Sequence, residues 1–321
     1  MFSIITPLHN KEKHIRHTIE SVLNQSFKDL ELIVVNDAST DNSVSIVQSY
    51  KDDRVRIETI EHAGVSGARN IGIELAKYEW IAFLDADDWW SPDYLKVLSK
   101  AIANYPKQRF FATGQILHTE QGTTKRFVNL SDSSQSIELL DYVCHFAKFA
   151  SPCQTSCACI SKGLFEKVGM FTKGISKYED IELWLRLGVE APLVFVNSHL
   201  SHYRQTVSDS LSSKKWAPKE AKMFLQNIQE LAQNARTSEQ KKCLTQVYDR
   251  MLRTIGVHEF HRYSADEIDD MVNFVRHHFS MRHYIQILFY KYLSFIMRLK
   301  FMMKMYHSVT SPIRSIRRAL A

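Results

Sequence analysis

The residues best suited to chemistry are the three carboxylates of Asp85-Ala86-Asp87-Asp88, which directly follow an apolar run ending at Leu84. Carboxylates packed at a strand end repel one another and need a cation or hydrogen-bond donors nearby. Mg²⁺ or Mn²⁺ fits this requirement, because carboxylates and substrate phosphates are its usual ligands. The alternative is an exposed acidic turn that leads into a helix capped near Ser91.

Two more polar segments follow apolar runs, at Thr6–Asn10 and at Asn36–Asp41. In open α/β sheets, ligands bind at the carboxyl ends of the strands, so these segments are expected to share an edge with Asp85 and Asp87. The Asp37 carboxylate could accept a hydrogen bond from a base N–H. The alternative interpretation is that this turn only caps the next helix. Capping does not explain two acidic strand ends on one sheet.

The elements that must position these residues alternate short apolar runs with segments of helical period, which is the pattern of βαβ units around a parallel sheet. Leu32–Val35 is apolar without alternation, as expected of a central strand buried on both faces. The predicted strands of the first hundred residues are 2–7, 30–36, 55–60 and 80–85. Further on, we predict a hairpin over 109–118 and 123–128, a strand over 157–160, a helix over 178–190 and a short strand over 194–196. The sheet should become mixed in this part.

Several other classes of protein fit the sequence poorly. The segment Gly64–Asn70 is neither a Walker loop nor a GxGxxG sequence, and the first strand is followed by no glycine, which disfavours a dinucleotide-binding dehydrogenase. Five cysteines, an odd number, fit a reducing compartment better than a disulfide framework. Cys153, Cys157 and Cys159 match no standard zinc spacing and are expected to be buried.

At this point the chain resembles a known family, the family-2 inverting glycosyltransferases with the GT-A fold, over roughly residues 2–210. The matching elements, in order, are Ile4–Glu12, Val35–Asp41, Gly67–Gly72, Leu84–Asp88, Glu179–Arg186 and Tyr203-Arg204. Each is weak alone, but several in this order are specific. The resemblance implies an α/β protein with a GT-A (Rossmann-like), mixed and mostly parallel sheet flanked by helices, followed by a C-terminal helical appendage.

The resemblance also implies roles for individual residues. Asp180 resembles the catalytic base, and Asp87 the acid of the DxD motif that coordinates the metal, Mn²⁺ or Mg²⁺. The residues expected to bind the nucleotide-sugar are Thr6, Pro7, Glu12, Asp37, Arg69, Asp85, Ala86 and Arg204. Asp37 would read the pyrimidine ring, Asp85 would lie on the ribose side, and Arg204 would lie near the diphosphate.

The expected reaction is a single in-line displacement with inversion, in which Asp180 takes the proton of an acceptor hydroxyl. Asn36, Ala38 and His9 depart from the residues most frequent in the family, and these departures leave the preference for base and sugar open. A UDP-sugar donor is therefore what the family resemblance implies, and the residues themselves do not establish it. The acceptor would be a glycan or lipid-linked molecule in cell-surface polysaccharide synthesis. Two alternatives are a catalytically silent nucleotide- or sugar-binding module and a nucleotidyltransferase, although the latter usually needs a first loop rich in glycine and basic residues.

The positive charge of the chain lies in its C-terminal third. Residues 1–215 hold 24 Lys and Arg against 26 Asp and Glu, whereas residues 216–321 hold 17 against 9. We predict a catalytic domain over 1–215 and a basic helical region over 216–321. Its apolar residues, interleaved with Lys291, Arg298, Lys300 and Lys304, suit a helix lying on an anionic membrane surface.

The alternative for this region is that Leu288, Tyr292 and Phe295 pack on the catalytic domain or a second subunit. No nucleic-acid-binding motif accompanies the basic charge, so a nucleic-acid partner is not expected. The first residues indicate a strand and lack the features of a signal peptide. We therefore expect a cytoplasmic protein, held peripherally at the inner face of the membrane.

Overall fold

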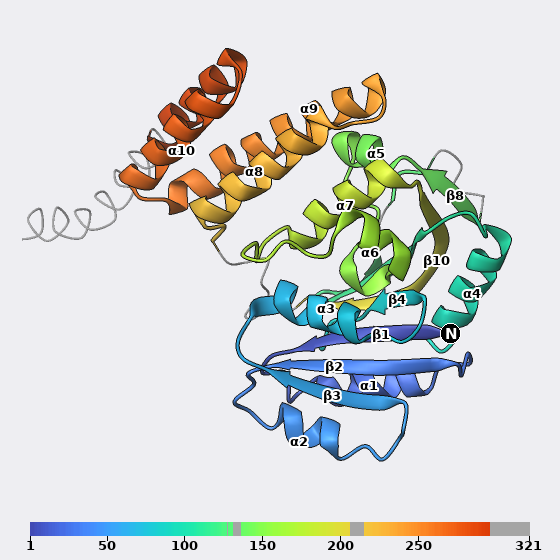
Figure 1. Ribbon diagram of the computed structural model, residues 1–321. Coiled ribbons are helices and arrows are strands. Elements are labelled where there is room, and N and C mark those ends of the chain that lie inside the picture. The colour runs from blue at the N-terminus through green and yellow to red at the C-terminus, as the bar shows by residue number, and fades with distance from the viewer. Residues whose placement is uncertain (127, 131–135, 206–214, 296–321) are drawn as a thin grey trace, which may run out of the picture. The chain divides into compact units, whose positions relative to one another are not determined.

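The computed structural model describes residues 1–126, 128–130, 136–205 and 215–295. Four parallel strands in the order β3-β2-β1-β4 form the N-terminal part of its sheet (Figure 1). They are β1 (Phe2–Leu8), β2 (Leu30–Asp37), β3 (Val55–Ile60) and β4 (Trp80–Phe83). The apolar runs predicted as strands are confirmed, and every residue of β2 is buried.

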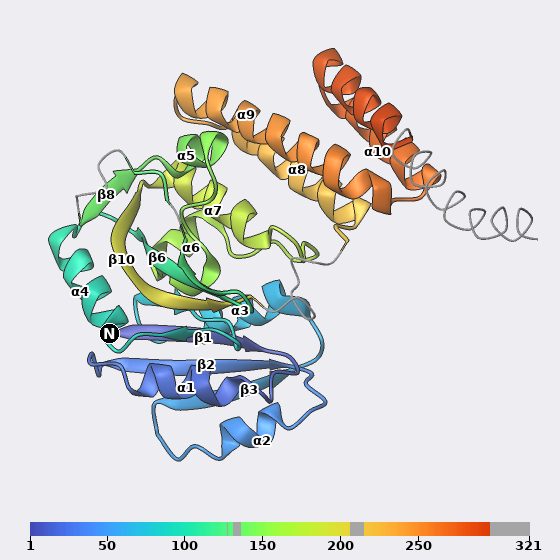
Figure 2. The ribbon, with the colours of Figure 1, turned by 180° about the vertical axis from the view of Figure 1, so that it is seen from behind.

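Helices cover both faces of these strands, because successive side chains of a strand point to opposite faces. Ile4 lies in the core that includes α1 (Ile15–Leu23). Its neighbour Ile5 lies against Gly72 of α3 (Gly64–Leu75), where an added Cβ would come 2.3 Å from Ile5 Cγ2. Figures 1 and 2 show α1 and α3 on opposite faces of the sheet. The glycine therefore allows α3 to approach the strand closely.

The sheet becomes mixed beyond β4, as predicted. Strand β9 (Ala158–Ser161) pairs antiparallel with β4 and with β6 (Phe110–Thr119). The predicted hairpin is formed by β6 and β7 (Gly122–Lys125). Between β4 and β6, α4 (Tyr94–Asn104) packs Leu95 and Leu98 into the core.

The last strand, β10 (Leu193–Arg204), is much longer than the predicted 194–196. It runs parallel to β6, with shifts of register between Val196 and Ser201. Its first part pairs with β8 (Ile137–Leu140) and its last part with β5 (Trp89–Trp90). The irregularity bends the strand so that it serves two partners. As a result, Arg204 reaches the edge of the sheet where β4 ends.

A disulfide joins Cys144 on α5 (Tyr142–Lys148) to Cys243 on α9 (Ser238–Thr254), 99 residues apart. The expectation drawn from the odd number of cysteines, that a disulfide framework fits less well, was wrong for this pair. Five cysteines can form one bridge and leave three thiols, and Cys153, Cys157 and Cys159 are free and buried, as predicted. Short helices complete this part of the chain: η1 (Thr155–Cys157), α6 (Lys162–Val168) and α7 (Glu179–Glu190), of which α7 confirms the helix predicted over 178–190.

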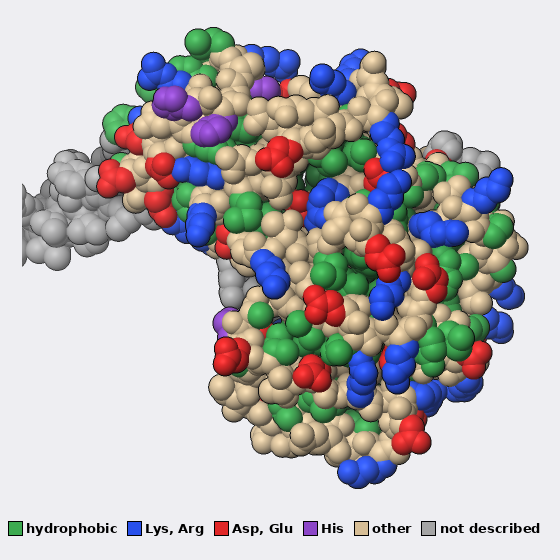
Figure 3. Space-filling model, in the orientation of Figure 1, with side chains coloured by type: hydrophobic (Ala, Val, Ile, Leu, Met, Phe, Trp, Pro, Cys, Tyr) green, Lys and Arg blue, Asp and Glu red, His purple; other side chains and the backbone are tan. Residues whose placement is uncertain are grey.

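The chain divides into two compact units, Met1–Lys214 with Asn227–Thr245, and Lys215–Gln226 with Gln246–Ala321. The boundary near residue 215 stays a prediction. On the face shown in Figure 3, acidic and basic side chains are interspersed. The described residues after 215 are mostly helical, as predicted, with α8 (Pro218–Gln233), α9, a π-helical turn at Ile255–Glu259, η4 (Phe260–Arg262), α10 (Ala265–His278) and helical residues 281–295.

Among the described residues, no helix combines the length and hydropathy needed to cross a bilayer. Arg298, Lys300 and Lys304 of the predicted membrane-surface helix lie outside the described residues.

Candidate active site

The acidic turn after β4 divides its residues between the interior and the surface. Asp88 is 1% exposed and accepts hydrogen bonds from Ser156 Oγ at 2.5 Å and from the backbone N–H of Arg204 at 3.0 Å. Ala86 is also buried, and its carbonyl accepts a hydrogen bond from Thr18. The side chains of Asp85 and Asp87 are 29% and 26% exposed. Asp85 and Asp87 are therefore the two carboxylates of the turn that a ligand can reach.

Burial raises the pKa of Asp88 well above its ordinary value, and the negative charges of Asp87 and Asp85 raise it further. Fixed cations offset this repulsion. Lys11 Nζ lies 2.8 Å from Asp87 Oδ2. Arg204 Nε donates a weak hydrogen bond to the Asp87 carbonyl at 3.4 Å. The first loop and the end of β10 thus both supply positive charge to the turn.

Arg69 on α3 connects the acidic turn to α7. Its guanidinium, 3% exposed, donates to Asp85 Oδ1 and to Glu179 Oε1, both at 2.8 Å. It also lies over the Phe171 ring, 5.1 Å from the centroid. Burial alone would lower the pKa of Arg69, but the two carboxylates raise it. We expected Arg69 to face the nucleotide. In the structure, its guanidinium is paired with two acids, Asp85 and Glu179.

Asp180, the expected base, is half-buried in the first turn of α7, next to Glu179. Its Oδ1 accepts the backbone N–H of Ile181 at 2.7 Å. Burial raises the pKa of Asp180, and Arg69 opposes this shift. Burial also raises the pKa of Glu179, to about 7. A carboxylate with a raised pKa is a stronger base, which suits the removal of a proton from a hydroxyl.

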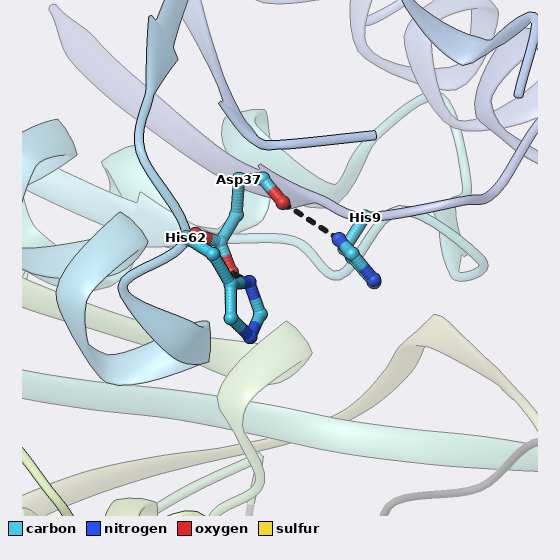
Figure 4. Close-up of side chains that lie close together, drawn as sticks. All are labelled: His9, Asp37 and His62. Carbon is cyan, nitrogen blue, oxygen red and sulfur yellow. Dashed lines mark hydrogen bonds and ion pairs between the residues drawn. The ribbon is translucent and has the colours of Figure 1, made fainter. Parts of the chain in front are cut away.

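Asp37, at the end of β2, is 3% exposed and caps the N-terminus of α3. Its two oxygens accept the backbone N–H groups of Ala63 at 2.6 Å and Gly64 at 3.1 Å. Capping is thus part of its role, although the capped helix is α3 and not the next helix along the chain, α2 (Ser43–Gln48), which the alternative interpretation had named. His62 Nδ1 lies 3.0 Å from the carboxylate, and His9 Nδ1 lies 2.6 Å from the carbonyl of Asp37 (Figure 4).

His9, Asp37 and His62 could together hold a cation, because each offers a ligand atom within 4.8 Å of the others. However, both carboxylate oxygens of Asp37 already accept backbone N–H groups, and His9 Nδ1 is bonded to the Asp37 carbonyl. The acidic turn has more capacity. Among the described residues, Lys11 contacts one oxygen of Asp87, and Arg69 contacts one oxygen of Asp85. The other oxygen of each carboxylate can therefore bind a hard cation.

The remaining predicted residues lie in the first strand and loop. Thr6 is buried in β1, and its Oγ1 has no hydrogen-bond partner among the described residues. Pro7 follows it, half-buried. Glu12 Oε2 accepts the backbone and side-chain N–H groups of Asn42, at 3.0 and 2.9 Å. Glu12 therefore links the two loops at the carboxyl ends of β1 and β2.

The structure brings Asp85, Ala86, Asp87, Arg69 and Arg204 into one connected group, and Asp180 adjoins this group because it follows Glu179, the partner of Arg69. Asp37 and Glu12 lie in the adjoining loops, which Lys11 joins to Asp87. Sequence reasoning missed Glu179 as the partner of Arg69 and Ser156 as the partner of Asp88, because 110 and 68 residues separate the members of these pairs. It also missed Lys11, although Lys11 stands inside the first matching element.

A further unpredicted feature is a group of rings beside the acidic turn. Trp89 stacks on His202, with ring centroids 5.1 Å apart, and also contacts His17 and His118. Arg204 lies over the Trp89 ring, 4.9 Å from its centroid. Burial lowers the pKa of His202 to about 4, with His118 and His17 contributing. These rings hold Arg204 beside Asp87.

Comparison with known proteins gives consistent results. Residues 3–166 match the family model described as glycosyl transferase family 2. The protein TuaG of Bacillus subtilis, whose name refers to teichuronic acid biosynthesis, is 30% identical over 228 residues, which cover 67% of this chain and 83% of TuaG. Glycosyltransferase GlyA of Streptococcus pneumoniae is 37% identical over 105 residues, which cover 32% of this chain but only 15% of GlyA.

Among solved structures, Staphylococcus aureus TarS 1–349 in complex with UDP-GlcNAc matches with a TM-score of 0.68 at 19% identity, covering 89% of this chain and 81% of TarS 1–349. At this level of identity the match shows a common fold.

Proposed function

Because the chain belongs to glycosyl transferase family 2, we propose that it is an inverting enzyme that transfers a sugar from a UDP-sugar to a hydroxyl of a glycan or lipid-linked acceptor. The observation that carries the proposal is that one buried arginine, Arg69, joins Asp85 of the acidic turn to Glu179, the residue next to the candidate base Asp180. The name of TuaG supports a role in cell-surface polysaccharide synthesis, and the UDP-GlcNAc bound to TarS supports a UDP-sugar donor.

The donor lies along the carboxyl edge of the sheet in this proposal. Asp37 reads the base at the end of β2, and the half-buried Pro7, which follows the buried Thr6, lies next to the nucleotide. Lys11, which contacts the Asp87 carboxylate, and Arg204, which contacts the Asp87 carbonyl, both face the diphosphate. These cations would meet the negative charge that grows on the leaving nucleoside diphosphate.

Asp87, with Asp85 beside it, would hold Mn²⁺ or Mg²⁺, because oxygen ligands with one unengaged atom each suit a hard divalent ion. Such an ion supplies Lewis-acid stabilisation of the leaving group. Asp180 accepts the proton of the attacking hydroxyl on its second oxygen, since Oδ1 is bonded to the helix backbone. The attack comes from the face opposite the leaving group, so the configuration of the anomeric carbon inverts.

The test is release of nucleoside diphosphate from UDP-, GDP-, CDP- and dTDP-sugars in the presence of Mn²⁺, with and without chelator. We expect release from UDP-sugars that chelator abolishes. Asp180→Asn should lower kcat by about 10²–10⁴-fold while UDP still raises the melting temperature. Asp52→Asn, at a partly exposed ion pair just before β3, is the matched control and should retain activity. Pyrophosphate release would indicate a nucleotidyltransferase, and silence with every donor would indicate a binding module.

An acceptor on a lipid carrier places the enzyme at a membrane, so the proposal includes peripheral attachment at the inner, cytoplasmic face through residues 216–321. The net positive charge of this region, 17 Lys and Arg against 9 Asp and Glu, supports it.

A further inference from the structure

Residues 281–295 of the second unit form a helical segment with one side docked on its own unit. Ile287, Tyr290 and Ser294 are 0%, 8% and 3% exposed. The Tyr290 ring lies so close to Gly256 that a Cβ there would come 2.3 Å from Tyr290 Cγ. Arg282 is paired with Asp249 at 2.9 Å, and Lys291 is paired with Asp269. These contacts fix the rotation of the helix about its axis.

The opposite side of the helix is apolar and exposed. At about 100° per residue, its apolar side chains fall within an arc of roughly 120°. They are Met281 (69% exposed), Ile285 (60%), Leu288 (37%), Phe289 (59%), Tyr292 (65%) and Phe295 (58%). We call this set the apolar face. Arg282 and Lys291 lie at its two borders. A contiguous exposed patch of this kind marks an interaction surface.

The charge of the surrounding chain identifies the occupant. From Met271 to Ala321 the sequence contains nine Lys and Arg and no Asp or Glu. The two acids that contact the helix flanks, Asp249 and Asp269, are already paired with Arg282 and Lys291. A second copy docked on the apolar face would bring this basic stretch of sequence together with its own copy, because a two-fold interface pairs a surface with itself. An anionic lipid surface offers both the negative charge and the apolar layer.

We propose that the apolar face inserts into the headgroup region of an anionic bilayer, with the helix lying in the plane of the membrane. Arg282 and Lys291 then sit at the level of the phosphates, as the basic residues at the borders of an interfacial helix do. The inference rests on the proposed function only for its purpose, which is access to an acceptor at the membrane. Lipid binding itself requires no donor, metal or catalysis.

The experiment is flotation of the full chain with vesicles of phosphatidylcholine containing phosphatidylglycerol, compared with phosphatidylcholine alone. We expect binding to the anionic vesicles that is at least about tenfold tighter and that weakens with salt. The double variant Ile285→Glu/Phe289→Glu should bind about 100-fold more weakly, tenfold for each lost anchor. Leu139→Glu, at a 49% exposed leucine on β8, is the matched control and should bind as the wild type does.

Both substituted anchors are exposed, so thermal unfolding of the double variant should match that of the wild type. Binding of the double variant at the wild-type level would overturn the inference. So would a light-scattering result in which the variant loses a dimer while vesicle binding is unchanged, because the apolar face would then belong to a second copy. Nucleoside diphosphate release is measured separately from flotation, without vesicles. A protein that floats but releases no nucleoside diphosphate contradicts the proposed function alone. A protein that releases nucleoside diphosphate but does not float contradicts this inference alone.

Discussion

Replacing Arg69 with methionine tests the connection between the acidic turn and α7. Methionine has nearly the length of arginine and can fill the buried space against Phe171, but it carries no charge and no donor. Arg69 donates to Asp85 and Glu179 at 2.8 Å each. The substitution therefore removes two charge-assisted hydrogen bonds and leaves two carboxylates facing each other.

The expected cost follows from burial. Removing one partner of a buried ion pair costs about 3–5 kcal/mol, because the other charge stays buried without compensation. Glu179 is almost completely buried, whereas the side chain of Asp85 is 29% exposed and keeps part of its hydration. We therefore expect Arg69→Met to lower the free energy of unfolding by about 3 kcal/mol. The control is Arg54→Met, because Arg54 and Asp52 form a bidentate pair that is 29% and 31% exposed, and such pairs contribute about 1 kcal/mol or less.

The cost of Arg69→Met should also depend on pH. Glu179 has a folded-state pKa of about 7, above its unfolded value, so the folded protein binds more protons between these values and loses stability as pH rises towards 7. Arg69 opposes this loss, because its charge lowers the pKa of Glu179. In the variant without Arg69, protonation of Glu179 at acidic pH removes its unpaired buried charge, whereas at higher pH Glu179 ionises and the unpaired charge remains. The destabilisation should therefore be smaller near pH 5 than near pH 8.

The assay is urea unfolding of wild type, Arg69→Met, Arg69→Lys and Arg54→Met at several pH values, with kcat measured on the same samples. Lysine should restore part of the stability, because it keeps the charge but cannot donate to both acids in a fixed fork. A cost for Arg69→Met that is no larger than that for Arg54→Met, and that is flat with pH, would refute the assignment of Arg69 as the residue that joins the two acids.

Two further predictions concern the rest of the first unit. In non-reducing buffer, Cys243→Ser should lower the free energy of unfolding by up to roughly 4–5 kcal/mol, because the bridge closes a loop of 99 residues. With reductant, the variant should be as stable as the wild type. Five reactive thiols in the unfolded, non-reduced wild type would show that no bridge forms. His202 has a folded-state pKa of about 4, below its unfolded value, so the unfolded chain gains a proton first as pH falls from about 6.5 to 4, and the folded state loses stability. His202→Gln should make the free energy of unfolding, measured by urea titration, depend less on pH in this window. An unchanged dependence on pH would contradict the burial of a neutral imidazole.

The parts of the fold that were predictable are those with strong local patterns. Strand β2 contains an uninterrupted apolar run, and α7 has apolar residues at helical spacing, so both were found from the sequence. The second half of β10 was missed because its residues, His199 to Arg204, are mostly polar. Their extended structure depends on pairing with β6 and β5, which are distant in the sequence.

The site divides in the same way. The acids at strand ends were visible because each follows an apolar run. The partners of these acids were not visible, since Glu179 meets Arg69 across 110 residues and Cys144 meets Cys243 across 99. Such pairs depend on the tertiary packing of segments that carry no local signal for each other, and the same is true of the Asp88 hydrogen bond to Ser156.

The acidic turn shows why a motif alone does not assign roles to its residues. Asp87 and Asp88 are identical in type and adjacent, yet Asp87 is exposed beside Lys11, whereas Asp88 is buried and accepts hydrogen bonds from Ser156 and the Arg204 backbone. Asp88 thereby holds the end of β10 against the turn, and with it Arg204. Asp88 therefore has a structural role, whereas we propose that Asp87 acts on the ligand. Asp85 and Asp87 are therefore the carboxylates that we propose face a ligand, because they stay partly exposed while Asp88 is buried in the fold.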